Sequence, residues 1–140
     1  MTSERQSGAA AGRTEALARL CDEFRVDVLY AFGSRAGEVR EWLAGERDAL
    51  SSGPADVDMG VKVNRETRLS FRDKVRLALA LEDLLGVTRV DLVVLNDADP
   101  FLAANVIRGE RLYARDEYAA DEYLSLIHIS EPTRPLYISY

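Results

Sequence analysis

The spacing of apolar residues changes several times along the chain, and each change marks a predicted element. Between residues 14 and 24 apolar side chains recur every third or fourth position, which is typical of an amphipathic helix. Short apolar or alternating runs, which are typical of strands, follow at 26–32, 56–63, 89–95 and 111–115. Helical spacing returns between them, at 36–50, 70–85 and 100–108. The sequence therefore predicts a domain of the α/β (α+β) class.

Helix-capping residues, a proline and two glycines predict where several of these elements begin or end. Ser70 is placed to begin the third helix, and Gly86 follows its last turn. Asp99 is a predicted N-cap, with Pro100 at the first helical position after it. The first strand is apolar throughout and ends at Gly33, so we expect it to be buried on both faces.

The two ends of the chain differ from the domain between them, which we assign to residues 14–124. Residues 1–13 are small and polar, and we expect a flexible N-terminus there. Residues 125–140 continue no pattern established upstream and resemble a translated sequencing adaptor, which indicates a non-native tail. The alternative is a natural extended arm broken by two prolines. The single histidine, His128, lies in this segment and is given no catalytic role.

Composition and charge exclude several classes of protein. The chain has 140 residues, and 18 Lys+Arg against 24 Asp+Glu give a net charge of −6, which argues against a general nucleic-acid binder. One cysteine, Cys21, excludes an intramolecular disulfide framework and a Cys-based zinc cluster, and it lies on the apolar stripe of the first helix. No apolar run approaches the length of a membrane span, and the N-terminus lacks the features of a signal peptide. We therefore expect a cytoplasmic protein.

Three aspartates are placed to converge at one edge of the sheet. Asp56 and Asp58 are two positions apart on one predicted strand, so their side chains point the same way, with Cα atoms roughly 6–7 Å apart. Asp91 lies in another strand, where a charge among apolar neighbours needs a partner. Carboxylates this close repel one another, and a divalent cation removes the cost of ionising them. The pattern predicts a Mg²⁺ site, in which Asp91 either completes a two-metal centre or acts as a base.

The turn after the first strand carries complementary chemistry. Gly33 permits close approach of the backbone to a ligand. Ser34, at the start of a helix, offers a hydroxyl and backbone N–H groups to phosphate oxygens, and Arg35 adds a positive charge. Each feature alone has a simpler explanation, such as a helix cap or a solvated strand end. Their conjunction and order favour a site for a nucleoside triphosphate and metal.

The order of these motifs resembles the nucleotidyltransferase superfamily that includes DNA polymerase β and the aminoglycoside nucleotidyltransferases, and most closely its minimal (MNT-type) members. The resemblance covers residues 14–116 and is carried by four stretches: YAFGSR at 30–35, DVDMGV at 56–61, VDLVVLN at 90–96 and IRGERLY at 107–113. It implies a polymerase β-like fold with a small mixed sheet flanked by helices. It also implies that Ser34 binds nucleotide phosphate, that Asp56 and Asp58 ligate Mg²⁺, and that Asp91 activates the acceptor hydroxyl.

The spacing departs from this family in one place. The family passes from Gly-Ser to Asp-x-Asp in about a dozen residues, whereas here Asp56 follows Ser34 by 22 positions. The excess falls at residues 42–52. It predicts a longer helix after Gly-Ser.

The resemblance also implies a reaction and a partner. MNT-type proteins are similar to antitoxins encoded beside HEPN-domain ribonuclease toxins, which implies transfer of AMP from ATP, with two Mg²⁺ ions, to a tyrosine of that toxin. Two alternatives stay open: a nucleotidyltransferase acting on a small molecule such as an aminoglycoside, and a non-catalytic antitoxin that acts by binding. We expect no direct nucleic-acid or membrane partner, and the sequence leaves homo- or hetero-oligomerisation open.

Overall fold

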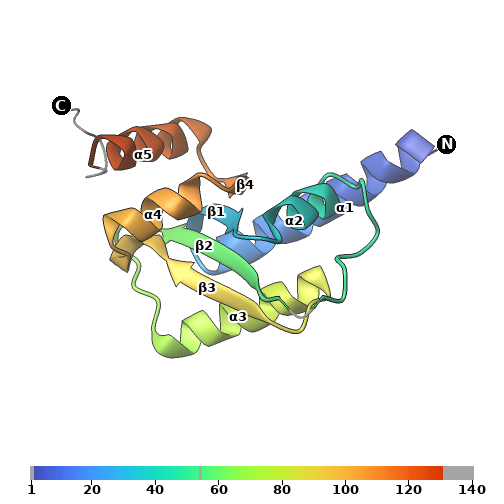
Figure 1. Ribbon diagram of the computed structural model, residues 1–140, viewed down its shortest axis with the longest axis horizontal. Helices are drawn as coiled ribbons and strands as arrows, with labels where there is room; N and C mark the ends of the chain where they lie inside the picture. Colours follow the sequence, from blue (N-terminus) through green and yellow to red (C-terminus); the bar gives the residue numbers. More distant parts are fainter. Residues whose placement is uncertain (1, 54, 131–140) are drawn as a thin grey trace.

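A four-stranded sheet forms the centre of the computed structural model, which describes residues 2–53 and 55–130 (Figure 1). Its strands are β1 (Val26–Phe32), β2 (Val57–Val63), β3 (Val90–Val94) and β4 (Glu110–Ala114), arranged in the order β3-β2-β1-β4. β1 pairs antiparallel with β2 and with β4, whereas β2 and β3 run parallel. The sheet is therefore mixed, as expected.

Two groups of helices cover the two faces of this sheet. On one face lie α1 (Thr2–Glu23), α2 (Ala36–Leu43) and α3 (Phe71–Leu85); on the other lie α4 (Pro100–Ile107) and α5 (Glu117–Ser130), and a short 3-10 turn, η1 (Leu95–Asp97), joins β3 to α4. Alternation along β1 explains the two layers, because Leu29 and Ala31 pack with the first group while Val28 and Tyr30 pack with the second. β1 is thus buried on both faces, which confirms the prediction from its apolar run. Cys21 is a buried residue of the first layer.

The predicted signals do mark the helix ends. Ser70 and Asp73 form a capping box at the start of α3: the Ser70 hydroxyl accepts from the Asp73 N–H at 3.0 Å, and the Asp73 carboxylate accepts from the Ser70 N–H at 3.4 Å. Gly86 ends α3 with a φ of 71°. Asp99 caps α4, with Pro100 in its first turn. These short-range signals suffice because each bond closes within three residues.

The terminal helices extend beyond the expected boundaries. α1 begins at Thr2, so residues assigned to a flexible N-terminus are helical; an alanine run at 9–11 favours helix there. α5 continues to Ser130, so residues 125–130 are helical rather than an extended arm. The rest of the predicted tail, 131–140, lies outside the described residues.

The segment after α2 corrects the predicted long helix. α2 has only 8 residues, and residues 44–53 and 55–56 lie outside any helix or strand, in a loop in which Gly45 adopts a φ of 78°. Arg13 of α1 holds the start of this loop by donating to three carbonyls, those of Trp42 (2.6 Å), Arg47 (2.9 Å) and Asp48 (3.1 Å). Its guanidinium also lies 4.7 Å from the centroid of the Trp42 ring. The extra residues are therefore a loop fastened to α1.

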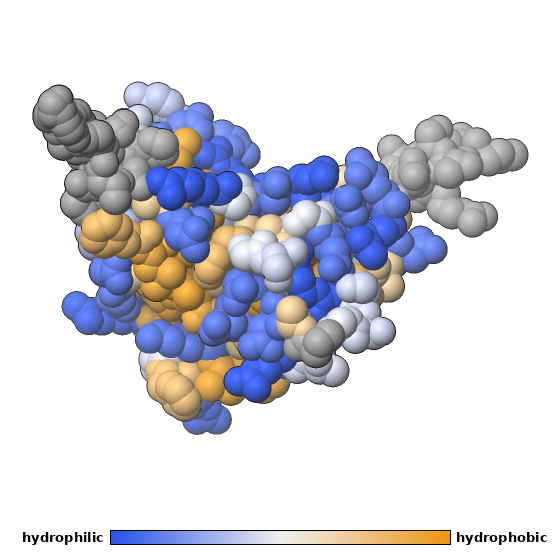
Figure 2. All heavy atoms as spheres, viewed as in Figure 1, coloured by the Kyte–Doolittle hydropathy of each residue, from blue (hydrophilic) through white to orange (hydrophobic). Residues whose placement is uncertain are grey.

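The surface of the molecule is uneven in polarity. Hydrophilic side chains cover most of the face over α1 and α2 in Figure 2, whereas apolar side chains gather over α4 and near the lower end of α3. Within the two described ranges, no helix is both long and apolar enough to cross a membrane.

The contact between α4 and the sheet generates a first prediction. A Cβ built at Gly60 of β2 would collide with Cγ1 of Val106 on α4. Gly60→Ala is expected to lower the free energy of unfolding by about 1–3 kcal/mol, because the Val106 side chain must shift from its place between α4 and the sheet. Gly12→Ala, in α1 where nothing lies within 4 Å of a new Cβ, is the control and should raise it by about 0.5–1 kcal/mol. Urea denaturation measures both, and unchanged stability in Gly60→Ala would contradict this packing.

Candidate active site

The predicted aspartates lie at the end of the sheet where β2 and β3 begin. Asp58 is the register partner of Phe32 on β1 and of Asp91 on β3. The Cα atoms of register partners on neighbouring strands lie about 5 Å apart. Because Asp58 and Asp91 are register partners in a parallel pair, their side chains point to the same face of the sheet. Asp56 directly precedes β2. The structure therefore places Asp58 beside Asp91, with Asp56 near them at the same end of β2.

Burial and the neighbouring carboxylates both disfavour the ionised form of Asp58. Burial raises the pKa of the Asp58 carboxyl above its ordinary value, and the negative charges of Asp91 and Asp56 raise the pKa further. The ionised form of Asp58 is therefore destabilised by its surroundings. A cation bound between these groups would relieve that cost.

Asp56 is held slightly apart by an arginine. Its Oδ2 lies 3.5 Å from Nε of Arg89, in an ion pair at the surface. Across residues 2–53 and 55–130, no group of three or more histidine, cysteine or acidic side chains is close enough to form a ready metal centre. The donor types and the strand register fit a hard cation such as Mg²⁺. To complete the set, the Asp56 side chain has to turn away from Arg89.

The turn after β1 lies directly against Asp58. Gly33 has a φ of 77°, and a Cβ built there would be 2.5 Å from Oδ2 of Asp58, so glycine is required for this approach. Ser34 follows as an exposed residue before α2, and no side chain caps that helix end. Backbone N–H groups at an uncapped helix start can receive anionic oxygens. The structure thus places the uncapped start of α2 beside Asp58.

Arg35 occupies a different place from the one expected. Its side chain is buried, with 6% of the residue exposed, and its guanidinium donates to the carbonyls of Ala55 (2.9 Å) and Ser51 and to Glu38 Oε1 (3.2 Å). The charge expected at the phosphate side of the site is therefore directed into the loop that leads to Asp56. In this position Arg35 joins the Gly-Ser turn to the start of β2.

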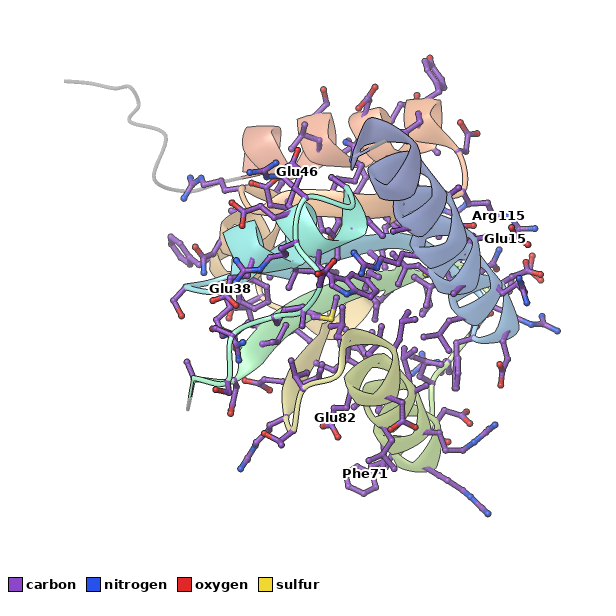
Figure 3. The ribbon with its side chains drawn as sticks, turned by 90° about the vertical axis from the view of Figure 1, so that its right-hand side faces the viewer. Glu15, Glu38, Glu46, Phe71, Glu82 and Arg115 are labelled. Atoms are coloured by element: carbon purple, nitrogen blue, oxygen red, sulfur yellow. The ribbon has the colours of Figure 1, made fainter. Side chains whose placement is uncertain are left out.

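Glu38, which was not among the predicted site residues, also holds the loop before Asp56 in place. Glu38 lies on α2 (Figure 3), and its Oε1 accepts from the N–H and the hydroxyl of Ser51, both at 2.9 Å. The hydrogen bond from the Ser51 backbone, with help from Arg35, lowers the pKa of Glu38 to about 2. No local pattern announces this contact, because its partners are 13 residues apart.

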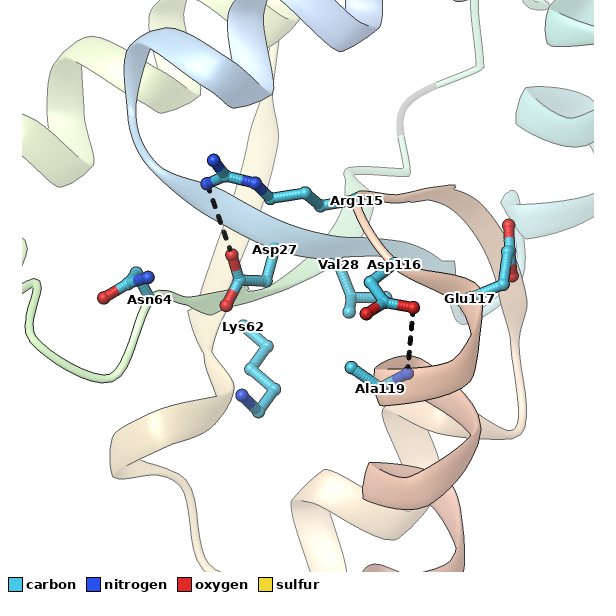
Figure 4. A pocket seen from close by; sticks show the side chains of 8 residues that line it. All are labelled: Asp27, Val28, Lys62, Asn64, Arg115, Asp116, Glu117 and Ala119. Carbon is cyan, nitrogen blue, oxygen red and sulfur yellow. Dashed lines mark hydrogen bonds and ion pairs between the residues drawn. The ribbon is translucent and has the colours of Figure 1, made fainter.

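A hollow of about 730 Å³ lies toward the opposite end of β1 and β2 (Figure 4). Lys62, Arg115 and Asp27 are among the residues that line it. Lys62 shares its strand face with Asp58 but is four residues, about 13 Å, further along, and its Nζ lies 5.2 Å from the centroid of the Tyr123 ring. The candidate active site is therefore separate from this hollow and does not include Lys62.

The whole arrangement corresponds to one known family. The family profile described as "Polymerase beta, Nucleotidyltransferase" matches residues 15–118. The chain belongs to this family and is a nucleotidyltransferase with the polymerase β-like fold.

Solved structures share the fold over most of the chain. An MNT antitoxin in complex with tri-AMPylated HEPN toxin from Shewanella oneidensis matches with a TM-score of 0.58 and 18% identity, covering 86% of this chain and 84% of that chain. A toxin–antitoxin structure with AMP-PNP matches with a TM-score of 0.56 and 21% identity, covering 86% and 91%. The MntA–HepT toxin–antitoxin structure gives 0.56 and 18%, covering 84% and 82%. No curated protein sequence matches the chain.

Repulsion at Asp58 leads to a prediction about thermal stability. Because the carboxylates destabilise one another, Asp58→Asn is expected to raise the Tm by a few degrees without divalent cations. Millimolar Mg²⁺ should raise the Tm of the parent protein but not that of Asp58→Asn. Thermal unfolding followed by circular dichroism checks this, with Asp22→Asn, an exposed aspartate of α1, as the control. An equal response to Mg²⁺ in the parent and in Asp58→Asn would contradict a metal site here.

The loop anchor leads to a prediction about acid stability. The pKa of Glu38 is about 2 in the folded protein against an ordinary value of 4.5, so its contribution is complete above 4.5 and is lost as the pH falls toward 2. Glu38→Gln should therefore lose less stability than the parent over that interval. Urea denaturation across this pH range measures the difference. Parallel pH profiles for the two proteins would show that Glu38 does not anchor the loop through its charge.

Proposed function

We propose that this protein transfers AMP from ATP, with Mg²⁺, to a tyrosine hydroxyl of a HEPN-domain ribonuclease toxin and so acts as its antitoxin. The observation that carries the proposal is the alignment of Gly33, Asp58 and Asp91 at neighbouring strand ends. A carboxylate repelled by two others lies there against an anion-binding turn. The choice of acceptor is supported by structures of the same fold, which are complexes with HEPN toxins, one of them tri-AMPylated.

The residues of the site divide the proposed work between them. Ser34 and the first turn of α2 hold phosphate oxygens. Asp56 and Asp58, with Asp91, would hold Mg²⁺, which offsets the charge of the triphosphate and of the carboxylates. Asp91 also accepts the proton of the tyrosine hydroxyl while the tyrosine oxygen forms a bond to the α-phosphorus. The bond from that phosphorus to pyrophosphate breaks, so the products are the AMP ester and pyrophosphate.

Arg35 contributes to this reaction as a positioning residue. Its hydrogen bond to the Ala55 carbonyl lies immediately before Asp56, and its backbone follows the Gly-Ser turn. The phosphate-binding and metal-binding halves of the site are thereby joined through one buried side chain. Preorganisation of this kind limits the rearrangement that substrate binding requires.

A labelling experiment tests the proposed reaction. The protein is incubated with α-labelled ATP, Mg²⁺ and a HEPN-domain ribonuclease toxin, and the toxin is expected to become labelled on tyrosine and to lose ribonuclease activity. Asp58→Asn and Asp91→Asn should each lower the labelling rate by roughly a hundredfold or more, because each removes a group used in the transfer step. Asp22→Asn is the matched control and should label the toxin at the parent rate.

Other outcomes would replace this function with an alternative. Labelling that survives in Asp58→Asn would contradict the assigned site. Neutralisation of the toxin by an Asp56→Ala/Asp58→Ala protein without nucleotide would favour a non-catalytic antitoxin. Labelling of a free aminoglycoside in the absence of any protein acceptor would favour a small-molecule enzyme.

A further inference from the structure

Helix α3 carries two separate apolar stripes, which lie about 120° apart around its axis. Leu77, Leu81 and Leu85 are spaced by four and are buried against the sheet. The outer stripe, which we define as Phe71, Val75 and Leu79, has the same spacing but is 81%, 40% and 53% exposed. A surface helix ordinarily keeps its outer side polar. The packing of α3 within this chain therefore does not explain why the residues of the outer stripe are apolar.

The outer stripe is presented on a firmly held helix. The capping box at Ser70 and Asp73 fixes the start of α3, and Glu82 in its last turns accepts a hydrogen bond from the Val90 N–H at 3.0 Å. In Figure 3 the Phe71 ring points away from the body of the molecule. A rigid helix with a projecting aromatic ring is well suited to anchoring a partner.

Unpaired cations gather around the first half of α3. We call Arg65, Arg68, Arg72 and Lys74 the basic rim; in the part of the chain that the structure describes, none of the four makes an ion pair, a side-chain hydrogen bond or a ring contact. By contrast, Arg76 on the same helix pairs with Glu23 and Asp73, each at 3.6 Å. Four unpaired cations on a chain of net charge −6 indicate a partner that is acidic at this point.

The outer stripe leads from the basic rim toward the candidate active site. α3 has 15 residues and is therefore about 22 Å long. The Glu82–Val90 hydrogen bond ties its last turns to the start of β3, one residue before Asp91. A partner lying along α3 would thus have one end over the basic rim and the other at the strand ends that carry Asp58 and Asp91, whose side chains face the opposite side of the sheet from α3.

We propose that the outer stripe and the basic rim dock an acidic amphipathic helix of the protein acceptor, an inference that rests on the proposed function because it assigns a surface to that acceptor. Apolar side chains of the acceptor helix pack on Phe71, Val75 and Leu79. Its acidic residues meet the basic rim, because the one acidic residue in the first half of α3, Asp73, is paired with Arg76, whereas Glu82 and Asp83 lie in the last turns. Docking at α3 raises the local concentration of the acceptor hydroxyl at Asp91.

Other occupants fit this surface less well. Single-stranded nucleic acid uses aromatic rings to stack bases, whereas two of the three side chains of the outer stripe are aliphatic. A symmetric dimer through α3 would bring the basic rims of two copies against each other, which like charges oppose. Phe101 and Leu102 of α4 are also exposed, at 57% and 36%, but no comparable cluster of unpaired cations accompanies them in the described residues.

The test measures binding and transfer separately, with the HEPN-domain toxin that serves as acceptor in the labelling experiment as the probe. Phe71→Ser/Leu79→Ser and Arg68→Glu/Arg72→Glu proteins should each bind it at least tenfold more weakly in calorimetry without ATP, and the parent complex should weaken with added salt. In the AMP-transfer assay these variants should raise KM for the toxin and leave kcat near the parent value. Phe101→Ser and Arg19→Glu, exposed residues of α4 and α1, are matched controls and should leave the affinity unchanged.

Several results would overturn the docking surface. These are unchanged affinity in both α3 variants, an equal loss in Phe101→Ser, self-association of the chain that Phe71→Ser abolishes, or binding of an RNA oligonucleotide that depends on Arg68 and Arg72. Failure of the proposed function looks different: the toxin binds through α3, but no AMP is transferred by the parent protein. Absence of any toxin binding to the parent would overturn both.

Discussion

The register of the central strand β2 is the constraint on which the rest of the structure depends. It pairs Asp58 with Phe32 on one side and with Asp91 on the other. A slip of one residue would turn Asp58 toward the three-helix core and Met59 outward. The buried partners on that core face, Val57, Met59, Val61 and Val63, prevent the slip. Hydrophobic burial on one face of β2 thus provides the free energy that keeps repelling carboxylates together on the other face.

The loop after α2 shows how the chain accommodates extra residues without disturbing this register. Arg13 holds the loop at its beginning, and Arg35 with Glu38 holds it at its end, directly before Asp56. The buried Nε of Arg35 has no hydrogen-bond partner within the described residues, a cost that the other bonds of the guanidinium offset. The loop is therefore part of the framework of the site. Helix α3 is likewise held in place, by its buried leucines and by the Glu82–Val90 hydrogen bond, and it exposes the outer stripe to solvent.

Much of the fold was predictable because its signals are local or periodic. The strand over 26–32, the capping box at Ser70 and the Asp99–Pro100 helix start each depend on neighbours a few residues away. That Asp58 and Asp91 lie side by side, with Asp56 two positions before Asp58, was predictable from side-chain alternation and motif order. The burial of Arg35 was not, because its acceptors are 16 and 20 residues along the chain. The early end of α2 and the ion pair of Asp56 with Arg89 likewise depend on tertiary contacts that no spacing rule encodes.

The central claim is that three carboxylates and the Gly-Ser turn form one site for metal and nucleoside triphosphate. A crystal structure of the protein with Mn²⁺ and a non-hydrolysable ATP analogue tests it most directly, because the anomalous signal of manganese locates the ion. The account predicts a manganese peak at coordination distance, about 2.0–2.2 Å, from oxygens of Asp56 and Asp58, with Asp56 turned from Arg89 and phosphate oxygens on Ser34. A peak elsewhere, or the analogue bound in the hollow lined by Lys62 and Arg115, would contradict it.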